Sequence, residues 1–222
     1  MINTVIFDLD GTLLNTLEDL KNSTNYALNE FGYESMTLEQ VRQYVGNGVR
    51  RLIELAIPNG EANSDFEECL AIFKKHYAKN MYNNTKPYYG IVEVLESLKQ
   101  QGIKTGVVSN KFDAAVKKLC EKYFGSLIDI AIGESDKVKK KPAPDSVFEA
   151  MNQLGSTKSE TIYVGDSDVD AKTANNAGLT CVGVTWGFRD RCVFDDNGVE
   201  NIIDSPQELL KKIKEININI AK

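Results

Sequence analysis

Short apolar segments and longer amphipathic segments alternate along most of this chain of 222 residues. The short segments are rich in β-branched and aromatic residues, which is typical of buried strands, and the longer ones have the apolar spacing of helices. Strands that alternate with helices form βαβ units, and such units predict an α/β fold with a doubly wound parallel sheet. The expected strands are 4–7, 104–108, 127–132, 161–164 and 180–184, and the expected helices are 90–101, 113–123, 143–154, 169–177 and a last helix that opens at Ser205.

Residues 15–85 interrupt this alternation, because their pattern is helical throughout. The apolar spacing predicts helices over 16–31, 37–44, 49–57 and 64–82. Two of these helices begin with the spacing of a capping box, at Thr37 and at Ser64. We therefore expect an inserted all-helical cap domain, the helical insertion, at 15–85, and an α/β core made of 1–14 and 86–222. An insertion directly after the first strand can close over the end of that strand, exclude water and select substrate.

Composition argues against several classes of protein. The formal net charge of −6 is unsuited to a nucleic-acid partner that relies on a basic surface. No apolar run approaches the roughly 20 residues of a membrane span, and the N-terminus lacks the basic start of a signal peptide. The cysteines lack metal-site spacing and are expected to be free thiols in a reducing cytoplasm: Cys69, Cys120, Cys181 and Cys192. The one histidine, His76, is expected on a solvated helix face, so the chemistry should depend on carboxylates, hydroxyls and lysine.

The first strand ends in two carboxylates, Asp8 and Asp10, and Gly11 supplies a turn behind them. Two acids at the end of a buried strand are costly unless a cation holds them there. The carboxyl ends of parallel strands are also where ligands bind in an open α/β sheet. A magnesium ion and a reactive carboxylate are therefore indicated. On this stretch alone, a simple turn with solvated acids remains an alternative.

Polar side chains also follow the other expected strands. Ser109 and Asn110 end the strand at 104–108, Lys141 lies in the loop before Pro142, and Asp166 ends the strand at 161–164. Because parallel strands point the same way, these groups could converge on one rim with the two acids of the first strand. Ser109 and Asn110 could instead cap the next helix, and Lys141 could be one solvated charge among several lysines.

Such a rim would suit phosphoryl transfer. Asp8 could attack phosphorus and Asp10 could protonate the leaving oxygen and later activate water. Lys141 and Ser109 would supply a cation and a hydroxyl for the phosphate oxygens. Asp166 would complete a Mg²⁺ site with Asp8 and the backbone carbonyl of Asp10.

The four motifs together resemble those of the haloacid dehalogenase superfamily, in order and spacing. They are Asp8-Leu-Asp-Gly-Thr12, Val107-Val-Ser-Asn110, Lys141-Pro142 and Gly165-Asp-Ser-Asp-Val-Asp170. The resemblance covers nearly the whole chain and implies a Rossmann-like core with a helical insertion of the C1 cap type. It implies that Asp8 is the nucleophile and Asp10 the general acid and base. It further implies phosphate binding by Thr12, Ser109, Asn110 and Lys141, Mg²⁺ at Asp8, Asp10 and Asp166, and Asp170 as a more distant or water-mediated partner.

Within the superfamily, the segment from Tyr44 to Arg50 is similar to a loop of phosphoglycolate phosphatases, and so is the pattern at 184–188. This similarity predicts a Mg²⁺-dependent hydrolase of small phosphomonoesters that forms an aspartyl-phosphate. Asn47 and Arg50 are candidate substrate contacts, since arginine pairs well with a small carboxylate. An exposed helix face is the alternative for Arg50.

Two other functions stay open at this point. The same core serves pyrophosphatases and sugar-phosphate phosphatases or mutases, and the helical insertion would decide between them. A phospho-acceptor regulatory domain also clusters acids, hydroxyls and lysine on a parallel sheet. The position of Asp8 on the first strand and the long insertion after it argue against that domain. The expected partner is a small phosphate ester, with no nucleic acid and no membrane, and the protein is expected to be a monomer or a homodimer.

Overall fold

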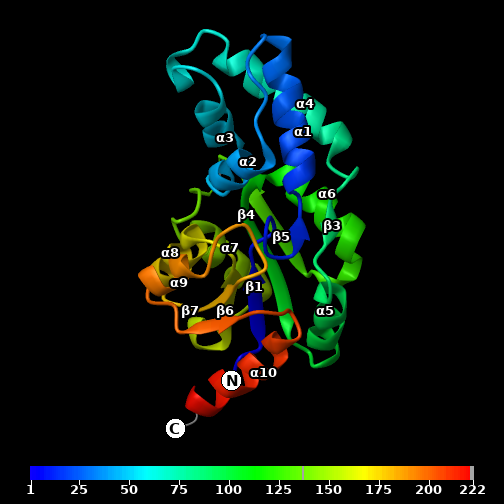
Figure 1. Ribbon diagram of the computed structural model, residues 1–222. Helices are drawn as coiled ribbons and strands as arrows, with labels where there is room; N and C mark the ends of the chain where they lie inside the picture. Colours follow the sequence, from blue (N-terminus) through cyan, green and yellow to red (C-terminus); the bar gives the residue numbers. More distant parts are fainter. Residues whose placement is uncertain (137, 221–222) are drawn as a thin grey trace. The chain divides into compact units, whose positions relative to one another are not determined.

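The computed structural model describes residues 1–136 and 138–220 (Figure 1). The chain forms two compact units. One is the α/β core, made of Met1–Leu14 and the chain from Pro87 onward, and the other is the helical insertion, Asn15–Lys86. Each unit is built around its own buried apolar residues and is described by itself.

The α/β core contains a six-stranded parallel sheet with the strand order β5-β4-β1-β6-β7-β8. Its central strand, β1, is apolar and fully buried, because it pairs with β4 on one side and β6 on the other. The predicted α/β class and parallel sheet are confirmed. The strands are β1 Thr4–Phe7, β4 Lys104–Phe112, β5 Ile130–Glu134, β6 Thr161–Gly165, β7 Thr180–Val184 and β8 Asn201–Ile203.

Helices cover both faces of this sheet, with α7 and α8 on one side and α5 and α6 on the other (Figure 1). Alternate strand residues point to opposite faces. Ile6 and Tyr163 therefore pack in the cluster under α7 and α8, whereas Phe7 faces the residues of α5 and α10. The helices are α5 Ile91–Gln100, α6 Asp113–Phe124, α7 Asp145–Leu154, α8 Asp168–Ala177, α9 Cys192–Asp196 and α10 Glu208–Ile220.

The helical insertion follows β1 and contains α1 Leu17–Glu30, α2 Leu38–Tyr44, α3 Val49–Ala56 and α4 Phe66–Asn80. The long helices α1 and α4 pack against each other and bury apolar residues such as Leu28, Phe73 and Tyr77. The capping box predicted at Thr37 is present and begins α2. Two-residue strands, β2 Leu14–Asn15 and β3 Lys86–Pro87, pair with each other at the two ends of the insertion. Asn15 therefore lies in a strand, where only helix was expected.

Several local predictions are wrong. The capping box expected at Ser64 does not form, because Ser64 donates to Asp65, which precedes α4 without a side-chain cap bond. Leu127 belongs to a 3₁₀ turn, Gly125–Leu127, so β5 begins only at Ile130. Short apolar runs at α9 and β8 gave no periodic signal and were not predicted. The asparagine-rich, charged segment 214–222 predicts a frayed end of the chain, but α10 continues to Ile220; residues 221–222 lie outside the described residues.

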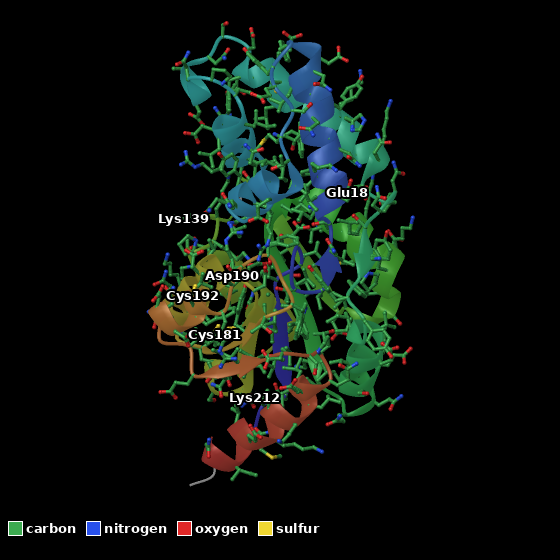
Figure 2. All side chains as sticks on the ribbon, viewed as in Figure 1. Glu18, Lys139, Cys181, Asp190, Cys192 and Lys212 are labelled. Atoms are coloured by element: carbon green, nitrogen blue, oxygen red, sulfur yellow. The ribbon has the colours of Figure 1, made fainter. Side chains whose placement is uncertain are left out.

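His76 is also not a simple surface residue. It is half-buried on α4, its ring stacks on Tyr26 at 4.1 Å between centroids, and its Nδ1 lies 3.0 Å from the Ser23 hydroxyl. The described cysteines are all free thiols, as expected; Cys181 and Cys192 are labelled in Figure 2. Among the helices that the structure describes, none combines the length and apolarity of a membrane span.

Candidate active site

Three carboxylates gather at the carboxyl ends of β1 and β6. Asp8 directly follows β1, and Asp166 directly follows β6; the two strands pair with Phe7 opposite Val164, which places these ends side by side. Asp170 comes from the first turn of α8, where a capping box with Ser167 fixes its position. One oxygen from each of the three carboxylates lies within 4.8 Å of the other two, and all three residues are buried.

Lys141 connects two of these carboxylates. Its Nζ donates to Asp8 Oδ1 at 2.7 Å, to Asp170 Oδ1 at 2.8 Å and to the Tyr163 hydroxyl at 3.0 Å. Burial opposes the charge on Lys141, but the carboxylates of Asp170 and Asp8 outweigh this effect and raise the pKa of Lys141. The alternative that Lys141 is a solvated charge is therefore excluded. Tyr163 was not predicted as a site residue; its sequence signal is a phenolic hydroxyl between the apolar Ile162 and Val164 of β6.

Burial also raises the pKa of Asp8, and the charges of Asp170 and Asp166 act in the same direction, against the attraction of Lys141. The pKa of Asp166 is raised to about 7, mainly by burial and then by the charge of Asp170. Hydrogen bonds from the Phe188 amide at 2.7 Å and the Thr12 hydroxyl at 3.1 Å partly offset this rise. The cluster therefore contains more negative charge than its protein partners neutralise.

Such a cluster fits a divalent cation. Three buried carboxylates offer the hard oxygen ligands that Mg²⁺ prefers, and a cation would compensate the charge that raises the pKa values of Asp8 and Asp166. Gly11 allows the backbone behind Asp10 to approach Asp166 closely. Its φ is +94°, and a Cβ atom at this position would lie 2.3 Å from Asp166 Oδ2. Asp170 thus lies in the same cluster as Asp8 and Asp166, and its implied role as a more distant or water-mediated partner of the ion stays a prediction.

The Asp10 carboxylate points to a different partner. Lys111 Nζ lies 2.9 Å from Asp10 Oδ1 and 2.9 Å from Asp10 Oδ2, and only 2% of the Lys111 side chain is exposed. Sequence reasoning missed Lys111 because it ended the strand at Val108. The available signal was a charged residue directly after Ser109 and Asn110. It indicates a buried site residue only when β4 is known to continue to Phe112.

Ser109 and Asn110 do not cap α6, so the helix-cap alternative is excluded. Asn110 instead clamps the backbone of Lys141: its Nδ2 donates to the Lys141 carbonyl at 3.1 Å, and its Oδ1 accepts from the Lys141 amide at 2.8 Å. The Ser109 hydroxyl accepts from the Lys111 amide at 3.2 Å. Asp113 is the first residue of that helix, and its Oδ1 accepts from the Gly133 amide at 3.0 Å.

The two candidate residues of the helical insertion differ in their surroundings. Asn47 is exposed in the turn before α3. Arg50, on α3, forms ion pairs with Glu61 at 2.7 Å and Glu67 at 2.6 Å, and its guanidinium lies 4.6 Å above the Phe66 ring. Within its own unit Arg50 is therefore paired with two carboxylates on a helix face where 41% of its side chain is exposed.

Known proteins resemble this chain in sequence and in fold. The family model of haloacid dehalogenase-like hydrolases matches residues 5–184. A phosphoglycolate phosphatase of Aquifex aeolicus is 34% identical over 185 residues, which are 83% of this chain and 85% of that protein. A phosphoglycolate phosphatase of Pseudomonas putida is 33% identical over 212 residues, which are 93% of this chain and 78% of that protein. The crystal structure of a predicted phosphoglycolate phosphatase from Haemophilus somnus gives a TM-score of 0.88 at 28% identity, over 95% of this chain and 97% of that one.

The parallel sheet, the buried acids at its strand ends and the helical insertion after β1 are those of a haloacid dehalogenase-like fold, and the position of the insertion is that of a C1 cap. The chain belongs to the haloacid dehalogenase-like hydrolases. The resemblance found in the four sequence motifs is confirmed, and both relatives named above are called phosphoglycolate phosphatases.

Proposed function

We propose that this protein is a Mg²⁺-dependent phosphomonoester hydrolase that forms an aspartyl-phosphate on Asp8. The observation behind this proposal is the Asp8 carboxylate at the end of β1, 2.7 Å from the buried Lys141 ammonium and grouped with Asp166 and Asp170. A carboxylate in such surroundings is a candidate nucleophile, because an adjacent cation neutralises the phosphate oxygens that would otherwise repel it.

The reaction proceeds in two displacements. An oxygen of Asp8 forms a bond to phosphorus as the bond from phosphorus to the leaving alkoxide breaks, and Asp10 gives its proton to that alkoxide. A water then attacks phosphorus, Asp10 accepts a proton from this water, and the bond from Asp8 to phosphorus breaks. Inorganic phosphate leaves and the Asp8 carboxylate is restored.

The remaining polar groups hold the phosphoryl group. Lys141 would neutralise charge on its oxygens, and Ser109 would donate its hydroxyl proton to one of them. Thr12 would have to exchange its hydrogen bond to Asp166 for one to the phosphoryl group. Asn110 keeps Lys141 in place through its two backbone contacts. Bound Mg²⁺, held by Asp8, Asp166 and Asp170 or by the Asp10 carbonyl, would supply Lewis-acid polarisation of a phosphate oxygen.

For the substrate, we propose a small phosphorylated carboxylic acid such as 2-phosphoglycolate. Support comes from the names of the relatives and from the loop Tyr44 to Arg50. The planar guanidinium of Arg50 suits a carboxylate and would have to exchange Glu61 or Glu67 for it, with Asn47 as a second contact.

The test is a set of initial rates with Mg²⁺ and with EDTA on 2-phosphoglycolate, pyrophosphate, sugar phosphates and nucleotides. We expect Mg²⁺-dependent turnover that is fastest on 2-phosphoglycolate. Asp8→Asn should reduce turnover to background, because an amide cannot act as the nucleophile, and circular dichroism should show an unchanged fold. Undiminished turnover by Asp8→Asn would contradict the mechanism, and a preference for pyrophosphate would contradict the substrate.

A further inference from the structure

A second buried lysine lies beside the proposed general acid. Lys111 and Asp10 form a forked ion pair in which Nζ contacts both carboxylate oxygens at 2.9 Å. The exposed fraction is 2% for the Lys111 side chain and 12% for the Asp10 side chain. A buried ammonium loses its hydration, so its presence at the rim of the active site calls for an explanation beyond packing.

The backbone of β4 is shaped to bring Lys111 there. Val108 pairs with Ile132 and Phe112 pairs with Glu134, so residues 109–111 of β4 stand opposite the single residue Gly133 of β5. Residues 109–111 of this bulge are all buried, like the regularly paired part of β4 before them. Gly133 permits the bulge, because a Cβ atom there would lie 2.7 Å from the Lys111 carbonyl oxygen and 2.4 Å from Asp113 Cα.

The backbone of Asp10 is held as well. Asp10 forms an isolated bridge with Leu14, and the Gly11 amide donates to the Leu14 carbonyl at 2.9 Å. With the main chain fixed on one side and both carboxylate oxygens contacted on the other, the plane of the Asp10 carboxyl group has little freedom to rotate.

We propose that Lys111 is a positioning residue for Asp10: its forked contact sets the orientation in which Asp10 meets the leaving oxygen of the substrate. This inference rests on the proposed function, in which Asp10 is the general acid. Lys111 differs in this from Lys141, which contacts the nucleophile Asp8. Proton transfer depends steeply on the geometry of the acid, whereas attack by Asp8 on phosphorus does not require Asp10 when the leaving group is a stable anion.

If Lys111 acts through the general acid Asp10, the rate loss on replacing Lys111 should therefore depend on the leaving group of the substrate. With enzyme in excess and Mg²⁺ present, single-turnover release of the alcohol is measured for 2-phosphoglycolate, whose alkoxide must be protonated, and for p-nitrophenyl phosphate, whose phenolate need not be. We expect Lys111→Met to slow the alkyl ester by about 100-fold and the aryl ester by at most about threefold. Lys111→Gln, which keeps a donor without the charge, should show the same selectivity with a smaller loss, and it serves if the Met variant does not fold.

Two further variants sharpen the result. In an Asp10→Asn background, Lys111→Met should have no additional effect on the alkyl ester, because the two residues act as one unit. Lys104→Met is the matched control: Lys104 begins the same strand and donates to the Leu154 carbonyl, so both rates should stay at the wild-type value.

The outcomes are distinguishable. If the wild type hydrolyses both esters and Lys111→Met slows them equally, or slows neither, the positioning role is wrong and the proposed function stands. If the wild type hydrolyses neither ester with Mg²⁺, the proposed function is wrong and this inference falls with it.

Discussion

At the scale of single residues, His76 is placed to report on the helical insertion. It is the one histidine of the chain, and its ring is packed between α1 and α4 through contacts with Tyr26 and Ser23. Burial disfavours the charged imidazolium, so the pKa of His76 is lowered from 6.5. Because the unfolded chain then binds a proton more readily than the folded one, the stability that His76 contributes is present above pH 6.5 and is lost as the pH falls below it.

This gives a prediction that a single NMR signal can check. The Hε1 resonance of His76 should titrate with a midpoint below 6.5 in the folded protein. Replacement by Gln removes the titrating group, so the free energy of unfolding of His76→Gln should change less than that of the wild type between about pH 7 and pH 5. A midpoint above 6.5, or equal pH dependence in both proteins, would show that the ring is solvated or paired with an acid.

At the scale of secondary-structure elements, Asp19 ties the start of the helical insertion to its end. Asp19 lies in the first turn of α1 and is buried. Its carboxylate accepts hydrogen bonds from the Asn84 amide at 3.0 Å and side chain at 2.9 Å, and from the Thr85 amide and hydroxyl at 2.9 Å each. These donors belong to the segment that leaves α4, so one side chain fixes the two chain ends of the insertion to each other.

Asp19→Ala should therefore destabilise the insertion strongly. Hydrogen bonds to a charged group contribute more than neutral ones, and the buried amide and hydroxyl of Thr85 would lose this acceptor, so we expect the free energy of unfolding to fall by about 3 kcal/mol in urea denaturation. The matched control is Glu18→Ala on the adjacent residue (labelled in Figure 2), whose exposed ion pair with Lys21 should contribute little. Equal, small effects of both substitutions would contradict the structural role of Asp19.

Several site residues and element boundaries could be predicted from the sequence alone. Asp8 and Asp166 were predictable as neighbours, because each directly follows a strand of a parallel sheet and parallel strands end on one edge. Lys141 lies in the loop between β5 and α7, where its position before Pro142 was the sequence signal. The strand β1 and the helix boundaries at Thr37 and at Gly178 were equally accessible, since capping residues and glycines mark them locally.

The features that could not be predicted from the sequence depend on contacts between segments far apart in the chain. Lys111 is buried because a bulge in β4 is accommodated by Gly133 on another strand, and a two-residue periodicity does not foresee such a bulge. The clamp of Asn110 on Lys141 joins residues 31 positions apart. His76 had a polar sequence context, and only the packing of α1 on α4 shows that its ring is half-buried.

At the scale of the whole molecule, the buried acids weaken the metal-free fold. The unfolded Asp166 carboxyl ionises near pH 3.8, whereas in the fold its pKa is about 7. Between these values the folded chain binds more protons than the unfolded chain, so this group makes stability fall as the pH rises from about 4 to about 7. A cation that binds only the folded chain would reverse this loss.

We therefore predict that MgCl₂ raises the melting temperature of the wild type relative to NaCl of equal ionic strength. At about 100 times its dissociation constant, a ligand of the folded state adds about 2.7 kcal/mol, which for a chain of this size is a shift of about 5–10 °C. The shift should be smaller at pH 6 than at pH 8, because protons compete with Mg²⁺ for a carboxyl group whose pKa is about 7.

Asp166→Asn should lose most of the shift and should itself be more stable than the metal-free wild type above pH 7, since it removes a buried charge. An equal Mg²⁺ shift in Asp166→Asn would place the cation elsewhere, and a shift that does not change with pH would show that the carboxylates are ionised throughout.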